Sequence, residues 1–425
     1  MSRAFLLWLI PWILAAGEGE DSGLLERYFP TGSRWWGTAM LSYKAQKEPE
    51  HSFADPDNNA FSATIVLGSE RWFGANLGLG WELAGWSDLG LGIADASRVS
   101  ESITLAKLSG LRKLQGAEVS QAYLSATWGN SLWRVGRMAL PKKLSPWLWS
   151  DRSAGVLDIV YEGVTVSYWT PGGVLWYGGW IDRAVNGGDV TRIGGERRGG
   201  SSPLDNGISF LSAHRVDEAD DWTLSAYYLG RSWHKPPDGT VFQGHGSREW
   251  AFWGAWLGRR IPALRGVQLV YIDGQAPGYR MTLAGALRFE WERASQRWRL
   301  TLAATNGGDY SMKTGGIGVG SGAFWGSSIS GEFGSDSVGA AMTLGRIDWF
   351  YDLEEGGRWY AGAALADFDG EGRYRYDRAF GARIGRRFEQ GAFFGKVEYR
   401  YRNMRYQGGR AIGRQRLRLD LGYRF

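Results

Sequence analysis

Basic side chains recur at alternate positions in three segments near the end of the chain, 379–388, 396–402 and 416–418. Residues two apart in an extended backbone lie on one face, so these cations share a face. Guanidinium groups in a row attract anions and bind carboxylates through paired hydrogen bonds. The same spacing also fits a charged surface whose cations only form local ion pairs, tempered by Glu398 and Asp420. The cations are Arg383, Arg387, Lys396, Arg400, Arg402, Arg416 and Arg418.

Arg386 falls outside this alternation. A residue can leave the period of two where an extra residue is inserted into a strand, or where the strand reaches its rim. We therefore expect either a bulge or a rim position at Arg386.

No residue pattern for catalysis is complete in this sequence. A hydrolase needs a nucleophile or a water, a base and an orienting partner within hydrogen-bond reach. The glycine-rich run 315–322 lacks the Gly-Lys-Ser/Thr ending and the helix of a phosphate loop. No cysteine is present, which excludes disulfides and thiolate chemistry. The four histidines are scattered, without a local Ser/His/Asp spacing: His51, His214, His234 and His245.

One oxygen-rich stretch is spaced like part of a calcium loop. Asp55, Asp57 and Asn59 alternate along the chain. The glycine and the downstream bidentate glutamate of a calcium loop are missing, so an Asx-rich turn is the simpler interpretation. We expect no catalytic residue, no metal and no cofactor.

The elements that position the cations are strands. From Leu417 to Phe425 every second residue is apolar, and charged residues or glycine lie between. A terminal strand of about ten residues has the length of a transmembrane barrel strand. A final phenylalanine with tyrosine two positions before it resembles the signal by which outer-membrane barrels are recognised for insertion. Tyr423 and Phe425 are therefore the expected assembly signal.

Period-two segments recur through most of the chain, at 222–229, 250–256, 283–291, 298–304 and 397–401, for example. They alternate with Gly-, Asp- and Asn-rich gaps typical of turns and loops. Strict alternation of direction fails only between 306 and 340. The pattern predicts an all-β fold, a closed transmembrane antiparallel β-barrel of about 18 strands with 16 as the alternative. Leu417, Leu419, Leu421, Tyr399 and Tyr401 are expected to face lipid. The seven cations are then expected to line the lumen, and a lumen wall with local ion pairs and no selectivity is the alternative.

Residues 1–17 have the features of a secretory signal peptide: Arg3, an apolar run and a small-residue end. Residues 18–425 would then form one barrel domain, without a separate plug. The chain contains 24 Trp, 19 Tyr and 64 Gly, and aromatic belts at two membrane interfaces would account for the Trp and Tyr. A formal charge of only +5, dispersed along the chain, argues against nucleic-acid binding.

The segment of about 120–182 carries a family resemblance. A Gln-Ala-Tyr-Leu strand at 121–124 is followed by a strand that ends at Gly136-Arg137, and a proline-containing loop leads to Asp151-Arg152. Tyr161-Glu162-Gly163-Val164 then starts another strand. This order resembles the OprD-like (Opr-type) outer-membrane porins. The resemblance implies an 18-stranded porin, monomeric or trimeric, with a narrowed lumen.

Loop 138–155 is the expected constriction, although a loop that stays outside the barrel is the alternative. The expected constriction residues are Arg137, Lys142, Lys143, Asp151 and Arg152. We expect a Gram-negative outer-membrane channel that passes small hydrophilic solutes and favours small anions, carboxylates above all. A barrel hydrolase and a structural or adhesion barrel are the alternatives. The expected partners are outer-membrane lipid and lipopolysaccharide, the barrel-assembly machinery, small solutes and, in a homotrimer, further copies of the chain.

Overall fold

The described residues of the computed structural model form strands joined by turns and loops. It describes residues 29, 32–47, 59–89, 115–146, 148, 150, 160–186, 189–192, 207–216, 220–229, 249–258, 261–273, 280–308, 324–325, 341–354, 356–369, 376–406, 408–409 and 411–425. In this part of the chain no helix is long and apolar enough to cross a membrane. The expected signal peptide, 1–17, lies outside the described residues.

The strands follow the predicted period-two segments closely, because alternation of apolar and polar side chains suits a sheet with two different faces. In chain order they are β1 (Arg34–Lys47), β2 (Asn59–Phe73), β3 (Leu77–Ser87), β4 (Gln115–Trp128), β5 (Ser131–Met138), β6 (Val160–Trp169), β7 (Val174–Asn186), β8 (Asp189–Arg192), β9 (Ile208–Val216), β10 (Asp220–Leu229), β11 (Glu249–Gly258), β12 (Leu264–Asp273), β13 (Thr282–Arg293), β14 (Gln296–Thr305), β15 (Met342–Asp352), β16 (Gly357–Phe368), β17 (Tyr376–Gln390), β18 (Phe393–Tyr406) and β19 (Ala411–Arg424).

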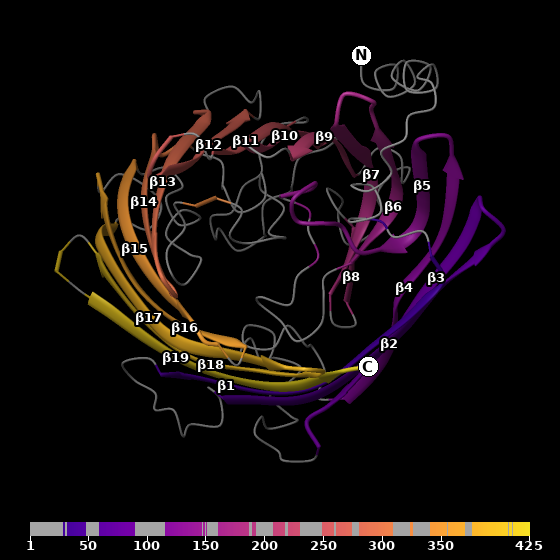
Figure 1. Ribbon diagram of the computed structural model, residues 1–425. Coiled ribbons are helices and arrows are strands. Elements are labelled where there is room, and N and C mark those ends of the chain that lie inside the picture. Colours follow the sequence, from indigo (N-terminus) through magenta and orange to yellow (C-terminus); the bar gives the residue numbers. More distant parts are fainter. Residues whose placement is uncertain are drawn as a thin grey trace, which may run out of the picture.

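These strands close into one antiparallel ring. β1 pairs with both β2 and β19, and β7 pairs with β9, which continues to β10. Among the described strands β8 pairs with β7 alone, and it lies inside the ring (Figure 1). The barrel therefore has 18 strands, as predicted.

Strand pairing resolves the stretch between 306 and 340, where strict alternation of strand direction fails in the sequence. β14 and β15 are direct antiparallel neighbours, from Gln296 opposite Tyr351 to Thr305 opposite Met342. The stretch between them is thus a single connection, and the barrel gains no strand there.

The seam between the first and last strands is fixed by polar contacts. Ser42 lies opposite Asp420 and donates a hydrogen bond of 2.6 Å to its carboxylate. Four residues further along β1, Gln46 accepts a hydrogen bond of 2.7 Å from Arg416. Both contacts are on the inner face of the sheet.

The outer face is apolar. Leu419, Leu421 and Tyr399 are exposed, as are Val397 and the other large side chains of the same parity. The predicted lipid-facing residues Leu417 and Tyr401 share this face, since they lie opposite Tyr399 and Gln415. An apolar exterior on a closed barrel is the arrangement that a bilayer requires.

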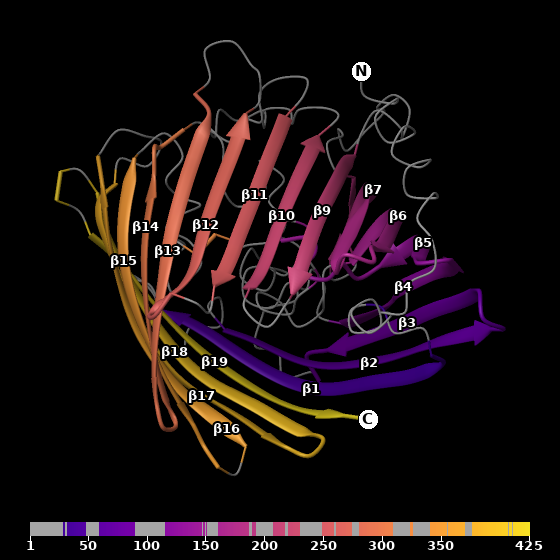
Figure 2. The ribbon, with the colours of Figure 1, turned by 45° about the horizontal axis from the view of Figure 1, so that its top comes forward.

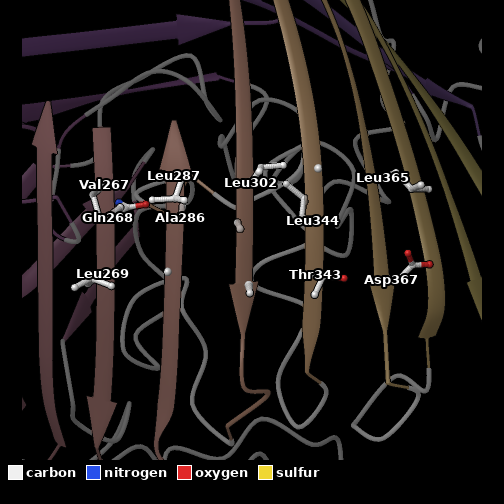
Figure 3. Close-up of a pocket in the computed structure, with 14 residues that line it drawn as sticks. Val267, Gln268, Leu269, Ala286, Leu287, Leu302, Thr343, Leu344, Leu365 and Asp367 are labelled. Atoms are coloured by element: carbon white, nitrogen blue, oxygen red, sulfur yellow. The ribbon is translucent and has the colours of Figure 1, made fainter. Parts of the chain in front are cut away.

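A groove of about 590 Å³ runs along this outer face over β12–β16. In Figure 3 leucines from several strands line it, among them Leu269, Leu302 and Leu365. Small residues such as Gly285 and Gly345 form part of its floor, and the space above Gly345 is open. The groove belongs to the lipid-facing surface and not to the interior of the barrel.

The two ends of the barrel differ in their connections. Short turns close β2–β3, β4–β5, β13–β14 and β17–β18 at one end (Figure 2). In the turn between β13 and β14, Ala294 has a φ of 49°, as the tight hairpins of barrels require at such positions. Outer-membrane barrels have their short turns on the periplasmic side. Phe425 lies at this end, where its backbone N–H donates to the carbonyl of Gly37.

Candidate functional site

The seven predicted basic residues all lie on the inward face of β17, β18 and β19. Their parity is opposite to that of the exposed Val397, Tyr399 and Leu419. Pairing brings Arg383, Arg400 and Arg416 directly beside one another across the three strands. We call the set Arg383, Arg387, Lys396, Arg400, Arg402, Arg416 and Arg418 the basic wall.

The inward row of cations extends beyond the predicted set. Arg402 on β18 lies opposite Arg414 on β19. In the other direction the same cross-strand row passes through β17 and β16 to Arg346 on β15, and then through β14 to Arg288 on β13. The signal was present in the sequence, since these residues occupy the same period-two positions as the predicted ones. The further inward cations are Lys44, Arg288, Arg297, Arg299, Arg346, Arg358 and Arg414.

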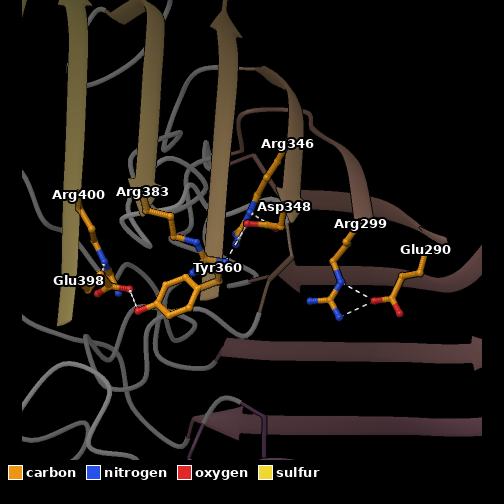
Figure 4. Close-up of polar contacts among 8 residues, drawn as sticks. All are labelled: Glu290, Arg299, Arg346, Asp348, Tyr360, Arg383, Glu398 and Arg400. Atoms are coloured by element: carbon orange, nitrogen blue, oxygen red, sulfur yellow. Dashed lines mark hydrogen bonds and ion pairs between the residues drawn. The ribbon is translucent and has the colours of Figure 1, made fainter. Parts of the chain in front are cut away.

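Buried carboxylates hold the cations of the wall in place. The carboxylate of Asp348 is 1% exposed and accepts from Arg346 at 2.7 Å and from Arg383 on β17 at 2.8 Å. Glu290 on β13 pairs with Arg299 on β14 in the same manner (Figure 4). A guanidinium tied to a fixed carboxylate loses much of its freedom to swing.

Glu398 is a further carboxylate of this kind, and it is 3% exposed. It accepts from Arg400 at 2.7 Å, pairs with Lys396 at 3.0 Å and accepts from the hydroxyl of Tyr360 at 2.9 Å (Figure 4). One carboxylate thus faces two cations on its own strand. On β19 Asp420 accepts from Arg418 at 2.5 Å as well as from Ser42. Even with these carboxylates, cations outnumber acids on this side of the interior.

An apolar cluster lies on another side of the interior. Inward-facing aromatic side chains of β7, β9 and β10 contact one another, with Tyr177 5.3 Å from Phe210 and Phe210 6.1 Å from Tyr227 between ring centroids. Phe29, which precedes β1, packs on Tyr177 at 5.3 Å. The guanidinium of Arg134 lies 5.0 Å from the ring of Phe29. All these aromatic rings are buried in one cluster.

The first part of the expected constriction loop belongs to this cluster. Leu140, Leu144 and Leu148 are at most 1% exposed and pack among these aromatic side chains. Leu140 and Ser150 are joined by two hydrogen bonds of 3.0 Å, which close the neck of the loop. These buried leucines therefore hold the described part of the loop against the inner surface of the barrel. Leu140, Leu144 and Leu148 thus do not lie on an outer surface.

The two lysines of this loop have different surroundings. Lys142 is exposed, and Lys143 pairs with Asp221 at the start of β10 at 2.5 Å. Asp151 and Arg152 lie outside the described residues.

Arg137 has a different place from the one expected. It lies opposite Glu162 on β6 and shares the face of Val135, which is exposed on the outside of the barrel. Its guanidinium pairs with Glu162 at 2.6 Å, and Glu162 also pairs with Arg183 at 3.2 Å. Its assignment to the constriction is therefore corrected: the alternation that puts Arg134 inside puts Arg137 outside.

Among the described residues, the candidates for catalysis and metal binding do not come together to form a site. His214 is buried and hydrogen-bonded to Thr223 at 2.7 Å. His51, His234 and His245 lie outside the described part of the chain, as do Asp55 and Asp57. Within that part no group of three or more metal-binding side chains is found.

Comparison with known proteins gives relatives by structure alone. No protein-family model matches the chain, and no curated protein sequence matches it. OccAB4 of Acinetobacter baumannii superposes with a TM-score of 0.65 at 11% identity, over 93% of this chain and 99% of that one. The outer membrane protein OpdK of Pseudomonas aeruginosa, whose structure is also known with vanillate, gives 0.64 at 12% identity, over 96% of this chain and 100% of that one. OccD3 (OpdP) of the same organism gives 0.62 at 12% identity, over 97% and 94%.

These similarities cover nearly the whole chain, whereas the sequence resemblance is specific only over about 120–182. The barrel architecture and the apolar outer face are those of a membrane-spanning barrel, and OpdK is itself an outer membrane protein. The chain has the fold of the OprD-like outer-membrane porins.

Proposed function

We propose that the protein is a porin through which small hydrophilic solutes diffuse, with a preference for small anions and for carboxylates in particular. The observation that carries this proposal is the basic wall, whose cations lie side by side across β17–β19 on the inward face. Cations repeated at neighbouring positions give a solute several weak contacts in series, which permits both entry and release.

Arginine suits this role because its guanidinium stays charged at any working pH and matches a carboxylate with two parallel hydrogen bonds. Asp348, Glu398 and Asp420 each engage part of a cation's donors. They lower the net charge of the wall, so that a bound anion is not retained. OpdK, a neighbour by fold, has been seen with vanillate, which is itself a carboxylate.

The narrowing of the pathway is assigned to loop 138–155. Its leucines are packed into the apolar cluster of the interior, and Lys142 is exposed. Solutes would then pass between this loop and the basic wall. The pathway is thus apolar and anchored on one side, and cationic on the other.

The test is the reversal potential across a salt gradient in planar bilayers. The native protein should favour anions, and the double variant Arg400→Glu with Arg418→Glu should lose or reverse that preference. Arg293→Glu is the control for charge reversal outside the interior, because Arg293 is exposed at the periplasmic end of β13. It reverses one charge there, whereas the double variant reverses two inside the barrel, so each single variant, Arg400→Glu and Arg418→Glu, is compared with it as well. A native pore that prefers cations, or a double variant that behaves like the control, would mean that the basic wall only hydrates the interior and does not determine ion selectivity.

A further inference from the structure

Arg386 does not belong to the basic wall, although Arg387 beside it does. Pairing through this part of β17 is continuous, with Gly385, Arg386 and Arg387 opposite Glu398, Val397 and Lys396. There is no bulge here, so Arg386 shares the outward face with the exposed Val397. It lies a few residues before the turn to β18, near the periplasmic rim. Of the two explanations offered by the sequence, the rim position is the right one.

Aromatic side chains form a patch beside Arg386 on this outer surface. Trp359 on β16 lies directly opposite it, and the guanidinium is 5.4 Å from the centre of the indole ring. On β15 Tyr351 lies opposite Trp359 and stacks with Trp349 at 6.1 Å. Trp298 on β14 adds a further ring, 6.4 Å from Trp349. Tryptophan and tyrosine gather where a bilayer meets water, which places Arg386 at the level of lipid headgroups.

The charge of Arg386 has no counterion among the described side chains. Among the described residues no carboxylate lies within 4.0 Å of its guanidinium, and its one close partner is the indole. Arg378, on the same face at the other end of β17, pairs with Asp367 at 2.8 Å. A cation on a surface that faces lipid is costly unless an anion meets it. At the depth of the headgroups the available anion is a phosphate.

A second arginine at the same end of the barrel has the same surroundings. Arg71 on β2 shares the outward face of the exposed Leu79, and its guanidinium lies 5.8 Å from the ring of Phe73. An outward arginine against an aromatic ring thus occurs twice at the periplasmic rim.

We propose that Arg386 and Trp359 bind the phosphate of a glycerophospholipid in the periplasmic leaflet. The guanidinium donates two hydrogen bonds to phosphate oxygens, and the indole face holds the guanidinium plane in position. The acyl chains lie along Trp349 and Trp298. This site is separate from the interior of the barrel and independent of solute passage.

The experiment measures lipid retention by native mass spectrometry of the purified full-length barrel in detergent. The two probes are dioleoyl phosphatidylglycerol and dioleoylglycerol, which has the same chains without the phosphate. The native barrel should retain the phospholipid in preference, and Arg386→Gln should reduce that retention about tenfold, since a charge-assisted contact is lost. Arg387→Gln, which removes the same charge from the inner face of the same strand, should retain the phospholipid like the native barrel.

Three results would overturn the site: equal retention of the two probes, unchanged retention in Arg386→Gln, or an equal loss in Arg387→Gln. The last would mean that overall charge, not this contact, holds the lipid. Should Arg386→Gln fail to fold, Arg386→Lys replaces it. Lysine keeps the charge but has neither the fork nor the plane, so retention should fall, and retention equal to that of the native barrel would refute the proposed geometry.

Discussion

Glu398→Gln should make the channel more selective for anions. Glu398 is buried in the basic wall between Lys396 and Arg400, and glutamine has the same shape without the charge. The substitution therefore raises the charge of the wall by one unit. At about 10 Å in water one unit charge is worth about 0.4 kcal/mol, which corresponds to about a twofold change in the local concentration of a monovalent anion.

The assay is the anion-to-cation permeability ratio from reversal potentials at low ionic strength, because about 0.1 M salt already screens charges over about 10 Å. Arg400→Gln should shift the ratio about twofold in the opposite direction. Substitutions at Glu398 and Arg400, which are neighbours on one face of β18, should thus shift the permeability ratio in opposite directions. Tyr360→Phe removes the hydroxyl that donates to Glu398 without changing any charge, and its ratio should stay near the native value. A Glu398→Gln channel that is unchanged, or that shifts towards cations, would refute the argument from wall charge.

Two further predictions concern assembly and the loop. Deletion of Phe425 should lower the amount of protein that reaches the outer membrane, measured by heat-modifiable gel mobility, while channels that do insert conduct normally; full assembly would leave Phe425 as a lipid-facing side chain only. Leu144→Ala should weaken the attachment of loop 138–155 by about 2–5 kcal/mol, since Leu144 is fully buried. Single-channel records should then show larger or noisier conductance, whereas a native trace would mean that the loop does not limit flow.

The sequence was most informative where alternation is strict. The final apolar and charged pattern from Leu417 onward predicted the inner and outer faces of β19, and pairing with β1 confirmed the closed barrel. Period two is a local property, so it survives in a single sequence. The same property identified the seven cations of the basic wall as inward-facing.

Pairing between distant strands could not be predicted in this way. Arg288 and Arg346 join the row of Arg402 only because the register of six neighbouring strands aligns them. Arg137 was assigned to the constriction from its place before the loop, although its parity with the apolar Val135 already indicated the outer face. The burial of Leu144 depends on aromatic residues of β7, β9 and β10, far away in the chain.

The contacts at the seam have a consequence for how the barrel completes its fold. A period-two pattern cannot distinguish the native alignment of β1 and β19 from one shifted by two residues, because both keep every side chain on its proper face. The bonds from Ser42 to Asp420 and from Arg416 to Gln46 form together only in the observed alignment. A misaligned closure would leave buried polar groups without these partners, in a place where that is costly. The two hydrogen bonds thus stabilise one register of the β1–β19 pairing over registers shifted by two residues, so polar residues of the first and last strands select the alignment in which the barrel closes.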